Sequence, residues 1–184
     1  METYIALLRG INVSGQKKIK MDDLRSLFEN LNFYEVITYI QSGNIVFKTE
    51  KRDQIKLVTL IREEIIKNFG FEVEVIILNV QEINEVFENN PFIKDTKKDR
   101  EKFYVTFLSE KPSNGNMERL SKYDYNPEEY HIINATIYFY APNGYGRAKM
   151  NNNFFEKILG VYATTRNWKT VHKLVDLTES DYQN

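Results

Sequence analysis

The 184-residue sequence contains no cysteine and only two histidines, His131 and His172. The absence of cysteine excludes disulfide bonds, thiolate nucleophiles and thiolate metal ligands. Two histidines without cysteine also argue against a zinc site, and neither a GxSxG nor an HExxH motif occurs. The sequence therefore predicts no metal and no cofactor.

Proline and glycine are scarce, at 4 and 8 residues, and no apolar run approaches the length of about 18 residues that would suggest a membrane span. Apolar residues make up 42% of the chain and aromatic residues 14%, a composition typical of globular proteins. The N-terminal segment shows neither the basic leader nor the apolar region of a signal peptide. We therefore expect a cytoplasmic protein with no membrane partner.

The overall charge is nearly balanced, but its distribution along the chain is uneven. Lys and Arg number 25 against 26 Asp and Glu, so the net charge of −1 predicts no partner. Between residues 141 and 175, however, Glu156 is the only acid. The cationic residues of this stretch are Arg147, Lys149, Lys157, Arg166, Lys169 and Lys173. This local excess suggests an anionic ligand.

The first half of the chain predicts the order β-α-β-β-α-β. Apolar patterning indicates a strand over 3–10, a helix over 21–33, a strand pair turning at Ser42-Gly43, a helix over 52–70 and a strand over 71–78. On the second helix the spacing places Ile55, Ile61 and Ile65 on one buried face. This order predicts a ferredoxin-like subdomain over residues 1–80.

The second half repeats the rhythm without repeating the sequence. A connecting helix near 79–92 precedes a strand over 102–108, a helical turn at 116–121, a strand pair about Asn134-Ala135, a helix ending at Gly160 and a closing helix over 164–179. The sequence thus predicts an α+β protein of two ferredoxin-like subdomains, 1–80 and 81–184, packed as one unit.

The stretch "ATTRNWKTVHKL" gives the strongest functional signal. With Thr164 or Thr165 as the cap of a helix beginning at Arg166, the cations Arg166, Lys169 and Lys173 share one face. Repulsion among them and with the helix dipole costs stability, so the arrangement favours a bound anion. The alternative is a solvated or internally paired face, with Trp168 in the core.

Three loops add polar side chains. The loop "GINVSGQKKIK" lacks the spacing of a phosphate-binding P-loop, but its backbone and Lys17, Lys18 and Lys20 suit an anion. The loop "NGYGRAKM" combines two glycines with Arg147 and Lys149. The turn "QSGN" contains polar residues that either recognise a ligand or only form the turn.

The blocks "YIALLRGINVSGQKKIKM", "TYIQSGNIVF", "GYGRAKM" and "LGVYATTRNWKTVHKL" resemble, in order and spacing, a bacterial family known as domain of unknown function 1697. The resemblance implies two ferredoxin-like subdomains and no particular reaction. Ser14 and Ala148 depart from the residues common in that family. The family's motif positions are Arg9, Gly10, Asn12, Gln41, Ser42, Gly43, Asn44, Gly146, Lys149, Arg166, Asn167, Trp168 and Thr170.

Three functions remain open from the sequence. The first is a binding module for a phosphate-containing ligand, either nucleic acid or a nucleotide-like molecule. The second is a transferase-like enzyme with a site between the subdomains and either His172 or a carboxylate as its titratable group. The third is a structural or oligomerising protein. No oligomeric state is indicated. The expected ligand-binding residues are Arg9, Asn12, Gln41, Ser42, Asn44, Arg147, Lys149, Arg166, Asn167, Trp168, Lys169 and Lys173.

Overall fold

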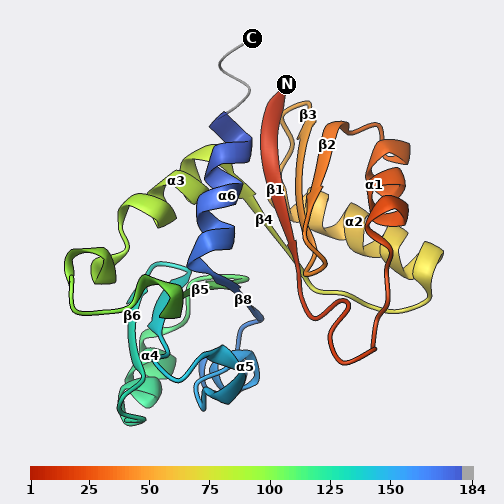
Figure 1. Cartoon of the computed structure of the whole chain (residues 1–184). Coiled ribbons are helices and arrows are strands. Elements are labelled where there is room, and N and C mark those ends of the chain that lie inside the picture. Colours follow the sequence, from red (N-terminus) through yellow and green to blue (C-terminus); the bar gives the residue numbers. More distant parts are fainter. Residues whose placement is uncertain (180–184) are drawn as a thin grey trace. The chain divides into compact units, whose positions relative to one another are not determined.

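The computed structural model describes residues 1–179 and confirms a mixed α+β protein (Figure 1). Its strands form two four-stranded antiparallel sheets. The chain divides into two compact units: unit 1 contains Met1–Asn84 and the end of the last helix from Leu174, and unit 2 contains Glu85–Lys173. Within the described residues, no helix is both long and apolar enough to cross a lipid bilayer.

Unit 1 has the strand order β2-β3-β1-β4. Its elements are β1 (Glu2–Leu8), α1 (Met21–Asn30), β2 (Tyr34–Tyr39), β3 (Asn44–Thr49), α2 (Gln54–Phe69) and β4 (Val75–Asn79). Asp53 begins α2 by accepting hydrogen bonds from the backbone N–H groups of Ile55 and Lys56. Gly70 ends the helix in the left-handed conformation, at the end that the sequence predicts.

The core of unit 1 lies between its sheet and its two helices. α1 contributes Phe28, whose ring meets Phe47 of β3 edge-on, while Phe33 stacks on Phe47 at a centroid distance of 4.6 Å. α2 contributes Leu57, Ile61 and Ile65. Ile55 was predicted on this buried face but is 76% exposed, because the buried face begins two residues further along at Leu57, and two residues span more than half a helical turn. Figure 1 shows both helices over the same face of the sheet.

The β2 edge of this sheet is interrupted. The pairing of β2 with β3 shifts register between Tyr34 and Ile37, and Glu35 adopts a positive φ of 49° within this shift. Tyr34 and Ile37 are exposed on the strand. The shift identifies a bulge that bends the outer strand.

Unit 2 also has a four-stranded sheet, in the order β6-β7-β5-β8. Its elements are α3 (Val80–Glu88), which begins in unit 1, the 3-10 helices η1 (Pro91–Lys94) and η2 (Arg100–Lys102), β5 (Phe103–Leu108), α4 (Asn114–Ser121), β6 (Glu129–Ile133), β7 (Thr136–Tyr140), the 3-10 helix η3 (Tyr145–Arg147), α5 (Asn152–Leu159), β8 (Ala163–Asn167) and α6 (Trp168–Glu179), which ends in unit 1.

Both faces of the second sheet are covered within unit 2. On one face Phe139 of β7 meets Phe155 of α5 edge-on at 5.9 Å. On the other, the buried Tyr138 hydroxyl donates to the backbone oxygen of Val86 in α3 at 3.0 Å. Burial and the nearby Glu85 carboxylate raise the pKa of Tyr138 to about 12. Tyr138 and Phe139, neighbours on β7, therefore contact α3 and α5 on opposite faces of the sheet.

Candidate functional site

The loop between β1 and α1 forms a tight hairpin, and its backbone N–H groups are not arranged around an anion site. The N–H of Asn12 donates to the oxygen of Lys17, and the N–H of Gln16 donates to the oxygen of Val13. Ser14 and Gly15 at its tip have φ values of 50° and 75°, the left-handed backbone of a two-residue hairpin turn. These N–H groups are therefore used within the loop, which removes them from the anion-binding role that the sequence suggested.

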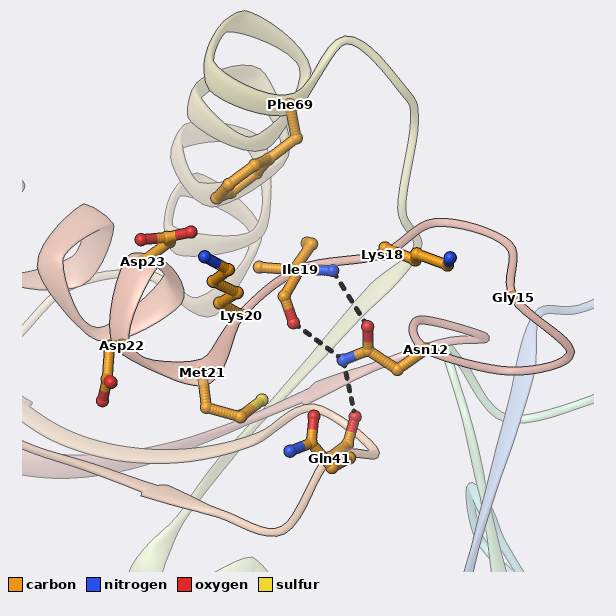
Figure 2. A pocket seen from close by; sticks show the side chains of 10 residues that line it. All are labelled: Asn12, Gly15, Lys18, Ile19, Lys20, Met21, Asp22, Asp23, Gln41 and Phe69. Carbon is orange, nitrogen blue, oxygen red and sulfur yellow. Dashed lines mark hydrogen bonds between the residues drawn. The ribbon is translucent and has the colours of Figure 1, made fainter.

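Asn12 fixes this loop through all the hydrogen-bonding atoms of its side chain (Figure 2). Its Oδ1 accepts from the N–H of Ile19 at 2.9 Å, and its Nδ2 donates to the oxygens of Ile19 and Gln41 at 2.9 and 3.0 Å. The loop is thereby attached to the tip of the β2–β3 hairpin. Asn12 was predicted to recognise a ligand, but the structure gives its amide an internal role.

A pocket of about 790 Å³ opens beside this loop in unit 1. It is formed by the end of the loop, the first turn of α1, the hairpin tip and the end of α2 (Figure 2). Its lining residues are Asn12, Gly15, Lys18, Ile19, Lys20, Met21, Asp22, Asp23, Gln41 and Phe69. The volume lies within the range of about 300–1,000 Å³ that is usual for small-molecule sites.

The pocket carries charges of both signs. Lys18 and Lys20 are exposed, and neither forms an ion pair or side-chain hydrogen bond within the described residues. Lys17 is different, because its ammonium donates a hydrogen bond to the backbone oxygen of Glu72. In Figure 2 the ammonium of Lys20 lies toward the carboxylate of Asp23, below the ring of Phe69. The pocket can therefore bind an anionic group and a hydrogen-bond donor together.

The beginning of α1 adds positive potential to the same pocket. Lys20 occupies the position before the helix and makes no side-chain cap, and the N–H of Leu24 is the first to bond back, to the oxygen of Lys20. The N–H groups of the first turn have no partner further back in the helix. Such groups, aligned with the helix dipole, favour a negative charge.

The QSGN turn contributes one side chain to the pocket. Gln41 is exposed and lines it. Asn44 is fully buried, and its Nδ2 donates to the oxygen of Tyr39 and to the hydroxyl of Ser42 at 3.0 and 2.9 Å. Arg9 does not line the pocket, and its backbone N–H donates to the backbone oxygen of Glu74. Asn44 and Ser42 therefore hold the turn.

The other predicted residues belong to unit 2. Arg147 and Lys149 are exposed on the loop around η3. The carboxylate of Glu128 fixes this loop by accepting from the N–H groups of Lys149 and Met150 at 2.8 and 3.0 Å. The ammonium of Lys149 lies 5.3 Å from the ring centre of Tyr125.

The prediction that the TRNW block is helical was wrong for most of the block. Thr164 and Arg166 belong to β8, and α6 begins at Trp168. The β-branched threonines suit a strand, and the cap is Asn167, whose Oδ1 accepts from the N–H of Thr170 at 2.8 Å. The predicted stripe of Arg166 with Lys169 and Lys173 therefore does not form.

Arg166 is buried, with 5% of its surface exposed. Its Nη1 donates to the hydroxyl of Thr164 at 2.8 Å and to the oxygen of Thr165 at 2.9 Å. Burial lowers the pKa of Arg166 to about 10, so the guanidinium stays cationic at neutral pH. These bonds give Arg166 an internal role.

The GYGR loop and α3 lie on opposite faces of the second sheet. Thr165 accepts a hydrogen bond from the Tyr145 hydroxyl at 3.1 Å. Its neighbour Arg166 must point to the other face. Arg166 and Tyr138 pair with the same residue of β5, so they share a face, and there Tyr138 bonds to Val86 of α3.

Trp168 lies with α3 on that second face. Its ring stacks on Phe87 at 5.2 Å with an interplanar angle of 3°, and the ring of His172 meets Phe87 edge-on. Trp168 is half-buried, Lys169 is exposed and Lys173 is half-buried. The structure thus separates Trp168 and its neighbours from the GYGR loop within unit 2.

Sequence reasoning singled out Asn12, Gln41 and two lysines, Lys18 and Lys20, but gave no ligand role to Asp22, Asp23 or Phe69. In the sequence, Asp22 and Asp23 are explained by the helix dipole, which favours acids in a first turn, and Phe69 is explained by packing of a helix face. Phe69 lies at the far end of another helix, so no local pattern could connect it with the loop. In the part of the chain that the structure describes, no three acidic or histidine side chains gather as a metal site would require.

The fold and the pocket define an α+β protein with one four-stranded sheet in each unit and a ligand-sized pocket in the first. The chain belongs to the family described as Protein of unknown function (DUF1697), whose model matches residues 1–138. A solved structure of the conserved bacterial protein SP0830 from Streptococcus pneumoniae is similar, with a TM-score of 0.76 and 22% sequence identity over 96% of this chain and 98% of that chain. The comparison with curated proteins gave no match.

Proposed function

We propose that the protein is a binding module for a small phosphorylated ligand of nucleotide type, which it holds in the pocket of unit 1. The observation that carries this proposal is the position of two lysines, Lys18 and Lys20, in a pocket of about 790 Å³ at the beginning of α1, which has no side-chain cap. Neither lysine is paired with any residue of the described range 1–179. Lysine ammonium groups and first-turn N–H groups together suit a phosphate.

The acidic residues of the pocket favour a small phosphorylated ligand over a nucleic acid. Asp22 and Asp23 lie within one turn of Lys20 and would repel the continuous backbone of a nucleic acid. A compact ligand with one phosphate avoids this repulsion, and its hydroxyl or amine groups can donate to the carboxylates. The ring of Phe69 supplies an apolar wall. A nucleoside monophosphate has one phosphate, hydroxyl or amine donors, and a flat base that can lie against the Phe69 ring.

Isothermal titration calorimetry with adenosine and guanosine monophosphates, ribose 5-phosphate, adenosine and inorganic phosphate tests this proposal. We expect saturable binding of a nucleoside monophosphate that is lost when the phosphate is removed. Lys20→Ala should weaken it by about 10- to 100-fold, since charged hydrogen bonds contribute about 1.5–3 kcal/mol. Lys56→Ala is the matched control, because Lys56 is exposed on α2 outside the pocket.

Asp23→Asn separates the roles of the two charges. It should tighten binding of inorganic phosphate by removing repulsion and weaken binding of the nucleotide by removing an acceptor. The proposal is overturned if no phosphorylated compound binds, or if Lys56→Ala has the same effect as Lys20→Ala.

We also propose that each unit is a variant of the ferredoxin-like fold. The order β-α-β-β-α-β occurs in both units, and the strand orders β2-β3-β1-β4 and β6-β7-β5-β8 correspond position by position. This correspondence supports a common fold for the units despite their different sequences.

A further inference from the structure

Unit 2 carries an aromatic platform that the pocket of unit 1 does not involve. Tyr123 and Tyr125 stack at a centroid distance of 6.2 Å with an interplanar angle of 25°. The ring of Phe154 meets both edge-on, at 5.2 and 5.6 Å. Tyr123 is 41% exposed, so the platform reaches the surface.

The platform is held firmly from below. Phe154 lies on α5 and contacts the fully buried Phe155 at a ring distance of 5.7 Å. Both Tyr125 and Phe154 pack against the core of unit 2. An aromatic surface fixed in this way loses little conformational freedom when a flat ligand stacks on it.

A lysine adjoins the platform, on a loop that carries a second cation. The ammonium of Lys149 lies 5.3 Å from the ring centre of Tyr125, and the backbone of Lys149 is fixed by the carboxylate of Glu128. Arg147, exposed two residues earlier, belongs to the same loop. The Lys149 ammonium is thus close to the rings, and it has no carboxylate partner within residues 1–179.

One carboxylate, that of Asp124, lies between the two tyrosines in the sequence. Its Oδ1 accepts from the N–H of Asn126 at 3.0 Å and so helps to form the turn that presents the rings. Its charge limits how many phosphates can approach. The platform therefore suits a short contact of one or two nucleotides at each protein molecule.

We infer that this platform binds single-stranded nucleic acid, with a base stacked on Tyr123 and the flanking phosphates paired with Lys149 and Arg147. Aromatic rings beside cations are the arrangement with which proteins bind single strands without reading their sequence. An acidic peptide would use the cations but would gain little from the rings. The inference is independent of the proposed nucleotide pocket, since it uses other residues in the other unit.

Fluorescence anisotropy with labelled eight-nucleotide oligothymidylate and oligouridylate tests the inference. We expect saturable binding that weakens between about 50 and 200 mM salt. Tyr123→Leu keeps an apolar side chain but removes the ring, and it should weaken binding by about 5- to 100-fold, the range for loss of one stacked base. The matched control is Tyr162→Leu, because Tyr162 is 51% exposed in the same unit outside the platform.

Further variants separate this site from the pocket. Lys149→Ala and Arg147→Ala should each reduce the slope of log affinity against log salt by about 0.7, whereas Lys20→Ala should leave oligonucleotide binding unchanged. The inference is overturned if no oligonucleotide binds at low salt, if Tyr162→Leu weakens binding as much as Tyr123→Leu, or if Lys20→Ala abolishes it. It is also overturned if polyglutamate binds as well and Tyr123→Leu has no effect on either ligand.

Discussion

Gly43, at the tip of the β2–β3 hairpin, lies against the central strand more closely than any other residue type would allow. Its φ is 77°, in the left-handed region. A Cβ atom placed on it would lie 2.7 Å from Cβ of Leu8 and 2.9 Å from Cδ1 of Ile11. The N–H of Leu8 also donates to the oxygen of Gly43 at 2.8 Å, so the two backbones are joined. Gly43→Ala therefore combines backbone strain with a steric clash.

The backbone strain and the steric clash of Gly43→Ala each lower the free energy of unfolding by an amount that can be estimated separately. An alanine in the left-handed conformation costs about 1–2 kcal/mol. Overpacking costs about 1–3 kcal/mol more, because Cβ of Leu8 belongs to a fully buried residue of β1 that has no room to move. We expect Gly43→Ala to lower the free energy of unfolding by about 2–5 kcal/mol.

Gly10→Ala provides the matched control. Gly10 has a similar φ of 69°, but an added Cβ would meet nothing within 4 Å. It should cost only the conformational part, about 1–2 kcal/mol. Urea denaturation followed by far-UV circular dichroism measures both variants, and their difference isolates the clash. Equal destabilisation by the two variants would refute the reasoning, since it would mean that the hairpin tip relaxes freely away from β1.

Three further predictions concern single side chains. The pKa of Tyr138 is raised from 10.0 to about 12, so the unfolded state loses the tyrosine proton first. The free energy of unfolding should therefore fall by roughly 2–3 kcal/mol as the pH rises from about 10 to 12. Urea denaturation across this range should show a smaller fall for Tyr138→Phe, and an unchanged fall would contradict the assignment. Asn12→Asp replaces a donor with an acceptor facing the oxygen of Ile19 and should lower the free energy of unfolding by about 1–3 kcal/mol, whereas unchanged denaturation would show that the bonds contribute nothing. Phe87→Leu removes the ring stacked on Trp168 and should shift its fluorescence emission to longer wavelength; unaltered emission would show that other contacts shield the indole.

The alternation of elements was predictable from local patterns, and the structure bears this out for most of them. α2 ends at Gly70, and the strand pair of β6 and β7 turns at Asn134, both as predicted. These signals work because caps and turns depend on residues adjacent in the sequence.

The error at the beginning of α6 has a tertiary cause. Thr164 and Thr165 are good caps as well as good strand residues, and local preference cannot decide between the two. Pairing with β5 decides it, since Thr164 lies opposite Phe107 and Arg166 lies opposite Val105. The cap then falls to Asn167, which moves Arg166 from a surface helix to a buried strand.

The candidate site was only partly predictable, for a similar reason. Polar residues of a loop can serve a ligand or the loop itself, and the sequence does not distinguish these uses. Asn12 and Asn44 prove to be internal, while Gln41 and Lys20 remain available to the pocket. The distinction depends on which backbone atoms lie within about 3 Å of each side chain.

The bulge in β2 also bears on how copies of the protein behave toward each other. A straight outer strand with exposed Tyr34 and Ile37 would offer unpaired backbone groups and apolar side chains to a second molecule. With Glu35 at a positive φ, the strand is bent where a neighbouring chain would have to align. One irregular residue thus protects a crowded protein solution against the edge-to-edge stacking that leads to fibrils.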